Sequence, residues 1–256
     1  MEGFLRGDTA LVTGAASGIG RGVATMLARE GARLVVADVD AERGGTVAAE
    51  IRRTGATVDF VASDLSRPDA ASQLFEAAQR KLGRISVLVH CASPYRRETD
   101  TALTVTPEIW DQMTSVNLRS GFFLGQSIGR HMCTAKVKGR ILFMTSLHAE
   151  VPRNLPHYSA SKAGMTMMMK ELARVLAPHG IRVNAIAPGA IPGGGFKSGD
   201  MDALQRQIPL GRFGTPEDIA QMALVLLCDR FSAYVTGTTV AVDGGIALQS
   251  WMPARE

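Results

Sequence analysis

A tyrosine and a lysine one helical turn apart are the residues of this chain whose types and spacing could do chemistry. Tyr158 and Lys162 belong to the segment YSASK, which we expect on a helix, so their Cβ atoms should lie roughly 5–6 Å apart on one face. A phenol titrates near pH ~10 and is a weak proton donor or acceptor at neutral pH. At an effective dielectric constant of ~20, an ammonium about 5 Å away favours the phenolate by ~3 kcal/mol, or roughly two pKa units. The pair therefore predicts a general acid/base that works near neutral pH.

The segments around this pair alternate between strand and helix patterns, which matters because an isolated Tyr-x-x-x-Lys also occurs by chance. Expected strands are residues 9–13, 33–37, 57–62, 85–90, 140–144, 181–187 and 238–242, and expected helices are residues 18–29, 41–54, 68–82, 107–131, 157–176 and 215–228. Strands that are apolar on both faces predict a parallel sheet covered by helices on both sides. We therefore predict an α/β fold, a single doubly wound domain over residues 1–256 with a seven-stranded parallel sheet.

The composition is that of an ordinary globular protein, with 46% hydrophobic and 20% charged residues and a net charge of +4. The basic residues are scattered, and the longest groupings, Arg52-Arg53 and Arg96-Arg97, are too short to predict a nucleic-acid partner. Three cysteines at wide spacings, with no CxxC, predict reduced thiols in the cytoplasm and no metal site. No signal-peptide core and no apolar run of about 18 residues is present, so we expect a soluble protein without a membrane partner.

A glycine-rich turn, TGAASGIG at residues 13–20, joins the first expected strand to the first expected helix. Glycines at such a turn allow the backbone to approach a pyrophosphate, which sits at the helix N-terminus. The turn alone is weak evidence for a nucleotide site, but a strand before it and a helix after it are the context that the motif requires. The candidate cofactor-binding residues of the turn are Gly14, Ser17, Gly18, Ile19 and Gly20.

An aspartate follows the second expected strand, 18 residues after the last glycine of that turn. Asp38 stands where a carboxylate can accept hydrogen bonds from an adenosine ribose. It would also repel a 2′-phosphate, because like charges about 5 Å apart at a dielectric constant of ~20 cost a few kcal/mol, or roughly a hundredfold in preference. Ser17 in the turn is not basic and offers that phosphate nothing. We predict NAD rather than NADP as the cofactor, with a helix cap ahead of Ala41 as the alternative role for Asp38.

Several ordered motifs together resemble the short-chain dehydrogenase/reductase family, from Thr13 to Gly245. They are TGAASGIG (13–20), Asp64-Leu65, Val116-Asn117-Leu118, Ser146, YSASK (158–162), NAIAPG (184–189) and VDGG (242–245). Motifs in this order and at matching spacing are far more specific than any one of them. The resemblance implies a Rossmann-like fold and a nicotinamide cofactor.

The resemblance also implies a role for each matching residue. Tyr158 would be the general acid/base, Lys162 would lower its pKa and hold the nicotinamide ribose, and Ser146 would hydrogen-bond the reacting oxygen. Asn117 would complete a proton relay to Lys162, or else satisfy a kink in its helix. Further cofactor contacts implied by the family are Asp64, Leu65, Cys91, Ala92, Pro188, Gly189 and Ile191, together with Tyr158 and Lys162.

The chain departs from the family pattern at two places that concern the cofactor. The segment after the fourth strand, usually Asn-Asn-Ala-Gly, is His90-Cys91-Ala92-Ser93. The loop after Gly189 lacks the threonine that usually meets the nicotinamide amide and has glycine there, in Pro192-Gly193. Both changes put the cofactor affinity in doubt and leave the reaction class as expected.

Specificity should come from the segments outside the carboxyl ends of the strands, at residues 94–98, 147–156 and a substrate loop at about 188–212. Parts of these segments resemble glucose 1-dehydrogenases and related polyol dehydrogenases. The candidate substrate-binding residues are Ser146, His148, Arg153, His157 and Tyr158, which would offer polar partners to several hydroxyls. The alternative is that the loop residues among them are only solvated.

The function that we predict is an NAD-dependent oxidoreductase that interconverts a secondary alcohol and a ketone, with a sugar or polyol as a possible substrate. One alternative is a 3-oxoacyl-carrier-protein reductase, a role that usually uses NADPH and that Asp38 opposes. Another is a non-catalytic NAD-sensing protein, which would not need the complete set of Asn117, Ser146, Tyr158 and Lys162. The resemblance further implies a homotetramer paired through the helices at 107–131 and 157–177.

Overall fold

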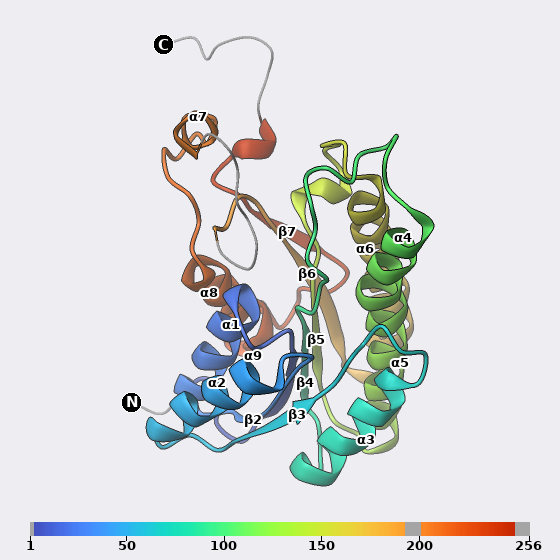
Figure 1. The fold of residues 1–256 in the computed structure, drawn as a ribbon. Coiled ribbons are helices and arrows are strands. Elements are labelled where there is room, and N and C mark those ends of the chain that lie inside the picture. Colours follow the sequence, from blue (N-terminus) through green and yellow to red (C-terminus); the bar gives the residue numbers. More distant parts are fainter. Residues whose placement is uncertain (1–2, 193–200, 249–256) are drawn as a thin grey trace.

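The computed structural model describes residues 3–192 and 201–248, and a seven-stranded sheet forms its centre (Figure 1). The strands are β1 (Thr9–Thr13), β2 (Arg33–Asp38), β3 (Val58–Ala62), β4 (Val87–His90), β5 (Arg140–Met144), β6 (Arg182–Pro188) and β7 (Thr239–Val242). Their order is β3-β2-β1-β4-β5-β6-β7, and each neighbouring pair is parallel. The predicted seven-stranded parallel sheet is confirmed. The order reverses between β1 and β4, where open α/β sheets bind ligands.

Helices cover both faces of the sheet, as the apolar strands predict. They are α1 (Gly18–Arg29), α2 (Ala41–Arg53), α3 (Ala70–Leu82), α4 (Pro107–Thr114), α5 (Ser120–Thr134), α6 (Pro156–Leu176), α7 (Met201–Arg206), α8 (Pro216–Leu227) and α9 (Asp229–Ser232). In Figure 1, α1, α2 and α8 lie on one side of the sheet, and α3, α4, α5 and α6 lie on the other. Each face buries its own apolar cluster, so the sheet is rigidly held between two cores.

The helix expected at residues 107–131 forms without interruption, but the sequence does not predict that part of it is π-helical. It divides into α4, a π-helical segment η1 (Ser115–Arg119) and α5. The first turn of α5, which follows the π-helical segment, packs closely against β4, since a Cβ atom at Gly121 would come within 3.1 Å of the His90 ring. A π-helical segment is a single wider turn inside an α-helix, and the residues on both sides of it keep the helical apolar period, so the sequence pattern does not reveal it.

Two short helices also lie where the sequence predicts none. The helix α7 falls inside the substrate loop expected at about 188–212, and α9 follows α8 directly. Residues 193–200 of that loop, including Gly193, lie outside the described residues. Helices this short are set by their surroundings, since a single turn forms few hydrogen bonds for the residues it fixes. Within the described part of the chain, no helix combines the length and the apolar character needed to cross a membrane.

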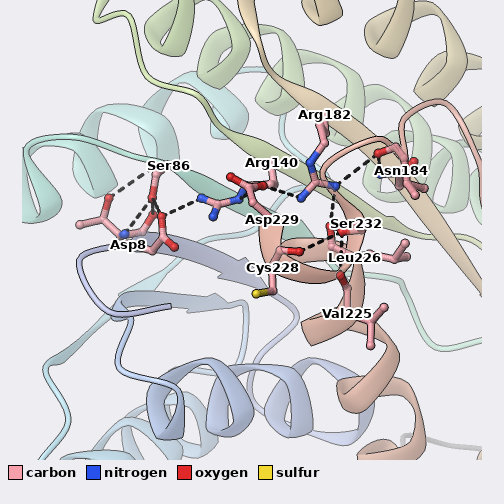
Figure 2. A network of polar contacts seen from close by, with 12 residues as sticks. Asp8, Ser86, Arg140, Arg182, Asn184, Val225, Leu226, Cys228, Asp229 and Ser232 are labelled. Atoms are coloured by element: carbon pink, nitrogen blue, oxygen red, sulfur yellow. Dashed lines mark hydrogen bonds and ion pairs between the residues drawn. The ribbon is translucent and has the colours of Figure 1, made fainter. Parts of the chain in front are cut away.

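Two buried arginines hold the amino ends of β5 and β6 together (Figure 2). Arg140 and Arg182 both reach Asp229 at the start of α9, at 3.3 and 2.9 Å. Arg140 also pairs with Asp8 at 2.8 Å, and Arg182 donates to the Leu226 carbonyl oxygen at 2.8 Å. Both arginine charges are therefore used inside the fold, at the end of the sheet opposite the carboxyl ends of the strands.

Candidate active site

The carboxyl ends of β1, β2, β4, β5 and β6 border a cavity of about 510 Å³. Predicted site residues that line it are Gly14, Ser17, Gly18, Ile19, Gly20, Asp38, Cys91, Ser146, His148, Tyr158, Lys162, Pro188, Gly189 and Ile191. Those that do not line it are Asp64, Leu65, Ala92, Asn117, Arg153 and His157. A larger hollow of about 760 Å³ lies between α1 and α2 but contains none of the predicted residues. We place the candidate site in the smaller cavity because the titratable side chains converge there.

Tyr158 and Lys162 lie one turn apart near the start of α6, as their spacing predicts. The Lys162 Nζ atom is 5.5 Å from the centroid of the Tyr158 ring and donates a hydrogen bond of 2.7 Å to the Met144 carbonyl oxygen at the end of β5. Both side chains are buried, with exposed fractions of 8% and 3%. The sheet therefore fixes the ammonium at a separation close to the one assumed from the sequence.

The environment of Tyr158 lowers its pKa. Burial acts in the opposite direction and raises the pKa of Tyr158, but the positive charges of Lys162 and Arg96 and a hydrogen bond from Ser146 outweigh it. Burial also lowers the pKa of Lys162, while the tyrosine charge works against that shift. A tyrosine whose phenolate is favoured in this way can take and return a proton near neutral pH.

Ser146 follows β5 and caps the short turn η2 (Leu147–Ala149), where its Oγ accepts a hydrogen bond of 3.3 Å from the His148 N–H. This turn brings the His148 ring edge-on to Tyr158, with the ring centroids 5.3 Å apart. Burial, followed by the charges of Arg96 and Arg153, lowers the pKa of His148 to about 3. The imidazole is therefore neutral at physiological pH, and its buried Nδ1 has no hydrogen-bond partner among the residues that the structure describes.

Asn117 lies in the π-helical segment and is fully buried. Its Nδ2 donates to the Ser161 Oγ at 2.8 Å, and Ser161 in turn donates to the Tyr158 carbonyl oxygen at 2.8 Å. The Asn117 side chain thus reaches the first turn of α6 through Ser161 rather than through the cavity. A relay role for Asn117 stays a prediction.

The start of α1 has free backbone N–H groups that suit an anion. Ser17 gives α1 no side-chain cap, as is also the case for α3 and α6, and the first turn of α1 has no acidic residue. Gly18 lines the cavity with a φ of +51°, and no atom lies within 4 Å of the place where its Cβ would be. This uncovered helix N-terminus fits a dinucleotide pyrophosphate.

Asp38 ends β2 and holds the glycine-rich turn. Its Oδ2 accepts a hydrogen bond of 2.9 Å from the Ala16 N–H, and its Oδ1 accepts one of 3.0 Å from the Asp40 N–H. Asp40, not Asp38, caps α2 through the Arg43 N–H at 2.9 Å, so the helix-cap alternative for Asp38 is wrong. The carboxylate of Asp38 stays at the cavity wall, where a ribose hydroxyl could meet it.

The predicted cofactor residues that do not line the cavity make their contacts in other parts of the fold. The Asp64 Oδ1 accepts hydrogen bonds from the Ser66 N–H and Oγ at 3.0 and 2.7 Å. Leu65 is buried in the apolar cluster on the α3 side of the sheet. The Ala92 backbone packs behind Gly14, where a Cβ would come within 2.7 Å of the Ala92 nitrogen, so this glycine is required by a close approach. Any cofactor contact from these residues remains a prediction.

His90, which replaces the first asparagine of the family pattern, is fully buried behind the cavity. Its Nδ1 lies 3.0 Å from the Thr13 Oγ1, which also accepts hydrogen bonds of 3.2 Å from the Cys91 and Ala92 N–H groups. Burial, and then the charge of Lys162, lowers the pKa of His90 to about 4. The His90 Nε2 has no hydrogen-bond partner among the described residues. The nearby backbone of η1 acts to raise the pKa of His90, but burial outweighs it. His90 is a neutral structural link between β1 and β4.

The adjacent Cys91 lines the cavity close to Lys162. Burial raises the pKa of the Cys91 thiol to about 12, and the lysine charge offsets only part of that rise. A thiol with so high a pKa is not a nucleophile at neutral pH. The cysteine in the His90-Cys91-Ala92-Ser93 segment therefore changes the cavity wall without adding reactive chemistry.

Replacing His90 with asparagine is expected to make the fold less sensitive to acid. Burial lowers the pKa of His90 in the folded chain to about 4, below the ordinary histidine value of 6.5, so on acidification the unfolded chain takes up a proton before the folded chain does. Stability is therefore complete above pH ~6.5 and is lost as the pH falls toward ~4, by about 3 kcal/mol for this residue. Urea unfolding at pH 7.5 and pH 4.5 would measure a smaller loss in His90→Asn than in the wild type. The exposed His179→Asn variant is the control, and an equal loss in His90→Asn and wild type would contradict this role.

The structure adds Arg96 to the candidate residues. Its guanidinium carbon lies 4.6 Å from the centroid of the Tyr158 ring, and the side chain lines the cavity together with Gln112. The sequence places Arg96 in a substrate segment, but no motif or spacing links it to Tyr158. At the other end of the cavity, Arg43 pairs with Asp40 at 2.6 Å, and no sequence motif indicates this arginine either.

Comparisons with known proteins agree with this geometry. A family model described as "Enoyl-(Acyl carrier protein) reductase" matches residues 14–247. The 3beta-hydroxysteroid dehydrogenase 1 of Eggerthella lenta is 38% identical over 260 residues, which cover 95% of each chain, and Glucose 1-dehydrogenase 2 of Bacillus subtilis is 34% identical over 95% of this chain and 96% of its own. A solved short-chain dehydrogenase/reductase from Serratia marcescens superposes with a TM-score of 0.87 at 30% identity, over 95% of this chain and 99% of that chain. The chain belongs to the short-chain dehydrogenase/reductase family.

The resemblance deduced from the motifs is thereby confirmed, and this short-chain dehydrogenase/reductase is an oxidoreductase of that family. One of the two relatives is named as a steroid dehydrogenase and the other as a sugar dehydrogenase, although their sequence identities to this chain are similar, at 38% and 34%. The comparisons therefore do not decide the substrate, which depends on the side chains that line the cavity.

Proposed function

We propose that this short-chain dehydrogenase/reductase uses NAD to interconvert a secondary alcohol and a ketone. The proposal is supported by one observation above all: Ser146, Tyr158 and Lys162 border the same cavity as the uncapped start of α1 and Asp38. A proton donor and acceptor, a helix N-terminus for pyrophosphate and a carboxylate for ribose thus meet in one space. The whole chain would act as one catalytic domain.

The proposed mechanism divides the chemistry between the protein and the cofactor. When bound, NAD would supply the hydride acceptor or donor at its nicotinamide ring. Tyr158 would take the hydroxyl proton of the alcohol during oxidation and return it to the carbonyl oxygen during reduction. Ser146 would donate a hydrogen bond to the same oxygen and stabilise its developing negative charge. Lys162 would keep the phenolate accessible and hold the nicotinamide ribose.

Asp38 supports NAD as the cofactor, because its carboxylate would repel a 2′-phosphate. The same charge argues against a 3-oxoacyl-carrier-protein reductase that uses NADPH. A sugar or polyol substrate is supported by the polar side chains near Tyr158, among them the neutral His148. We further propose a homotetramer and a cytoplasmic location, as expected from the sequence.

An absorbance assay at the NADH band tests this function. Sugars, polyols, hydroxy acids and steroids would be supplied with NAD or NADP, and reduction of the cofactor would be followed. We expect turnover with NAD on at least one class of secondary alcohol. Binding of NAD without turnover of any of these would favour the non-catalytic NAD-sensing alternative instead.

A further inference from the structure

Arg96 places a positive charge beside the residue proposed to react with substrate. Its guanidinium lies over the Tyr158 ring, and its side chain is 27% exposed at the cavity wall. An ion pair joins the Arg96 Nε and the Glu98 Oε1 at 3.9 Å, and the Glu98 side chain is 63% exposed. A long pair with a solvated carboxylate is worth little, so most of the Arg96 charge is available to a ligand.

The described residues that line the Tyr158 end of the cavity carry no carboxylate to balance this charge. The lining carboxylates are Asp38 and Asp40, and both lie at the end with the glycine-rich turn. Burial lowers the pKa of His157, and the charge of Asp100 opposes that shift, but Asp100 does not line the cavity. The Tyr158 end therefore has an excess of positive charge, which attracts anions strongly in a partly enclosed space.

The donors around Arg96 match a carboxylate in shape and number. A guanidinium presents a planar fork of N–H groups that fits two carboxylate oxygens. His148 adds a buried Nδ1 without a partner, and Gln112 adds an amide at the cavity wall. A phosphate dianion would require a second cation at this end of the cavity. Lys162 lines it, but its Nζ donates to the Met144 carbonyl oxygen and is proposed to hold the nicotinamide ribose, and Arg153 is exposed and outside the cavity lining.

We propose that Arg96 binds a carboxylate carried by the substrate near the reacting carbon, so that the substrate is a hydroxy acid, such as a sugar acid, rather than a neutral polyol. This inference rests on the proposed function and names its substrate class. A neutral ligand would take water away from the half-buried Arg96 guanidinium without offering it a counter-charge, and that desolvation is unfavourable. Arg96 thereby selects for the acid and against the matching alcohol.

Matched substrates test the proposal. Alditols would be compared with the corresponding aldonates, and short neutral alcohols with the corresponding 2- and 3-hydroxy acids, each with NAD. The readout is the ratio of kcat/KM for the acid to that for its neutral partner. Arg96 also lowers the pKa of Tyr158, but a change in phenolate content alters both members of a pair equally. We expect a ratio of about ten to a hundred in the wild type, the usual effect of a charge-assisted hydrogen bond.

Variants at two adjacent arginines separate this contact from a general charge effect. Arg96→Gln is expected to bring the ratio close to one, and Arg96→Lys to keep part of it. Arg97→Gln removes the same charge from an exposed neighbour outside the cavity and is expected to leave the ratio unchanged. A ratio near one in the wild type, or an equal fall in Arg97→Gln, would overturn the proposal, as would preference for a phosphate ester over the matching carboxylate.

A binding measurement keeps the proposal testable without turnover. In the Tyr158→Phe protein with NAD, calorimetric titration with aldonates and short hydroxy acids is expected to show affinity that falls about tenfold or more on adding Arg96→Gln. No carboxylate binding, or binding indifferent to Arg96→Gln, would overturn the inference. Turnover of neutral polyols with NAD at a kcat/KM that Arg96→Gln does not change would refute this inference and leave the proposed function standing. Failure to bind NAD or to oxidise any alcohol would refute the proposed function instead.

Discussion

Replacing Tyr158 with phenylalanine is expected to lower kcat/KM for alcohol oxidation by about a thousandfold or more, while NAD still binds. Phenylalanine keeps the ring that packs against His148 and the small apolar cluster with Met113 and Leu155. It removes the hydroxyl that would take the substrate proton, and no other described group at this end of the cavity is proposed to replace it. Steady-state kinetics and a calorimetric NAD titration measure the two effects.

A second tyrosine in the cavity provides the matched control for that experiment. Tyr95 also lines the cavity but is 62% exposed, so Tyr95→Phe removes a phenol of the same kind without touching the proposed proton path. We expect Tyr95→Phe to change kcat/KM only slightly. Activity of Tyr158→Phe close to that of the wild type would refute the proposed acid/base role.

Replacing Asp38 with asparagine is expected to raise the ratio of kcat/KM with NADP to that with NAD by roughly a hundredfold, since the repulsion of a 2′-phosphate at about 5 Å disappears. Asparagine keeps an oxygen that can accept a hydrogen bond from the Ala16 N–H, so the glycine-rich turn should persist. Part of the change should come from weaker use of NAD, because the amide is a poorer acceptor for ribose hydroxyls than the carboxylate. Kinetics with both cofactors at a fixed substrate concentration give the ratio.

Two further variants sharpen the Asp38 experiment. Arg43 lies at the same end of the cavity, paired with Asp40, and can approach a 2′-phosphate once Asp38 is neutral. Adding Arg43→Gln to Asp38→Asn should therefore reduce the gain with NADP. Asp59→Asn, at a surface pair with Lys81 outside the cavity, makes the same charge change and should leave the ratio unaltered. Equal use of both cofactors by the wild type would contradict the role of Asp38.

The sheet and most helices were predictable because local signals agree with the final fold. Strands such as β5, buried along its whole length, read as apolar runs, and α6 shows its start and its Tyr158–Lys162 face in the sequence. The π-helical segment at residues 115–119 was not predictable, because the local apolar pattern is that of an ordinary helix and the close packing of the next turn on His90 is a tertiary contact. The short helix α9 likewise owes its place to the arginines that meet at Asp229 (Figure 2).

The site divides in the same way between local and long-range information. The glycine-rich turn, Asp38 and Tyr158 belong to motifs whose spacing reflects a local structure, and all of them border the cavity. The contact of Arg96 with Tyr158 joins a loop to a helix more than sixty positions away, and no spacing encodes it. His157, predicted to meet substrate, is instead fully buried without a hydrogen-bond partner for either ring nitrogen. Burial of a side chain next to a motif is a tertiary property that the motif does not report.

Titration of tyrosine absorbance tests the central claim most directly, because the chain has only three tyrosines. The phenolate band would be followed against pH in the wild type and in Tyr158→Phe. We predict one tyrosine that ionises below the ordinary pKa of ~10, that is absent from Tyr158→Phe, and whose midpoint in the NAD complex matches the acidic limb of kcat/KM for alcohol oxidation. No tyrosine ionising below that range, or a low-pKa phenolate that persists in Tyr158→Phe, would contradict it.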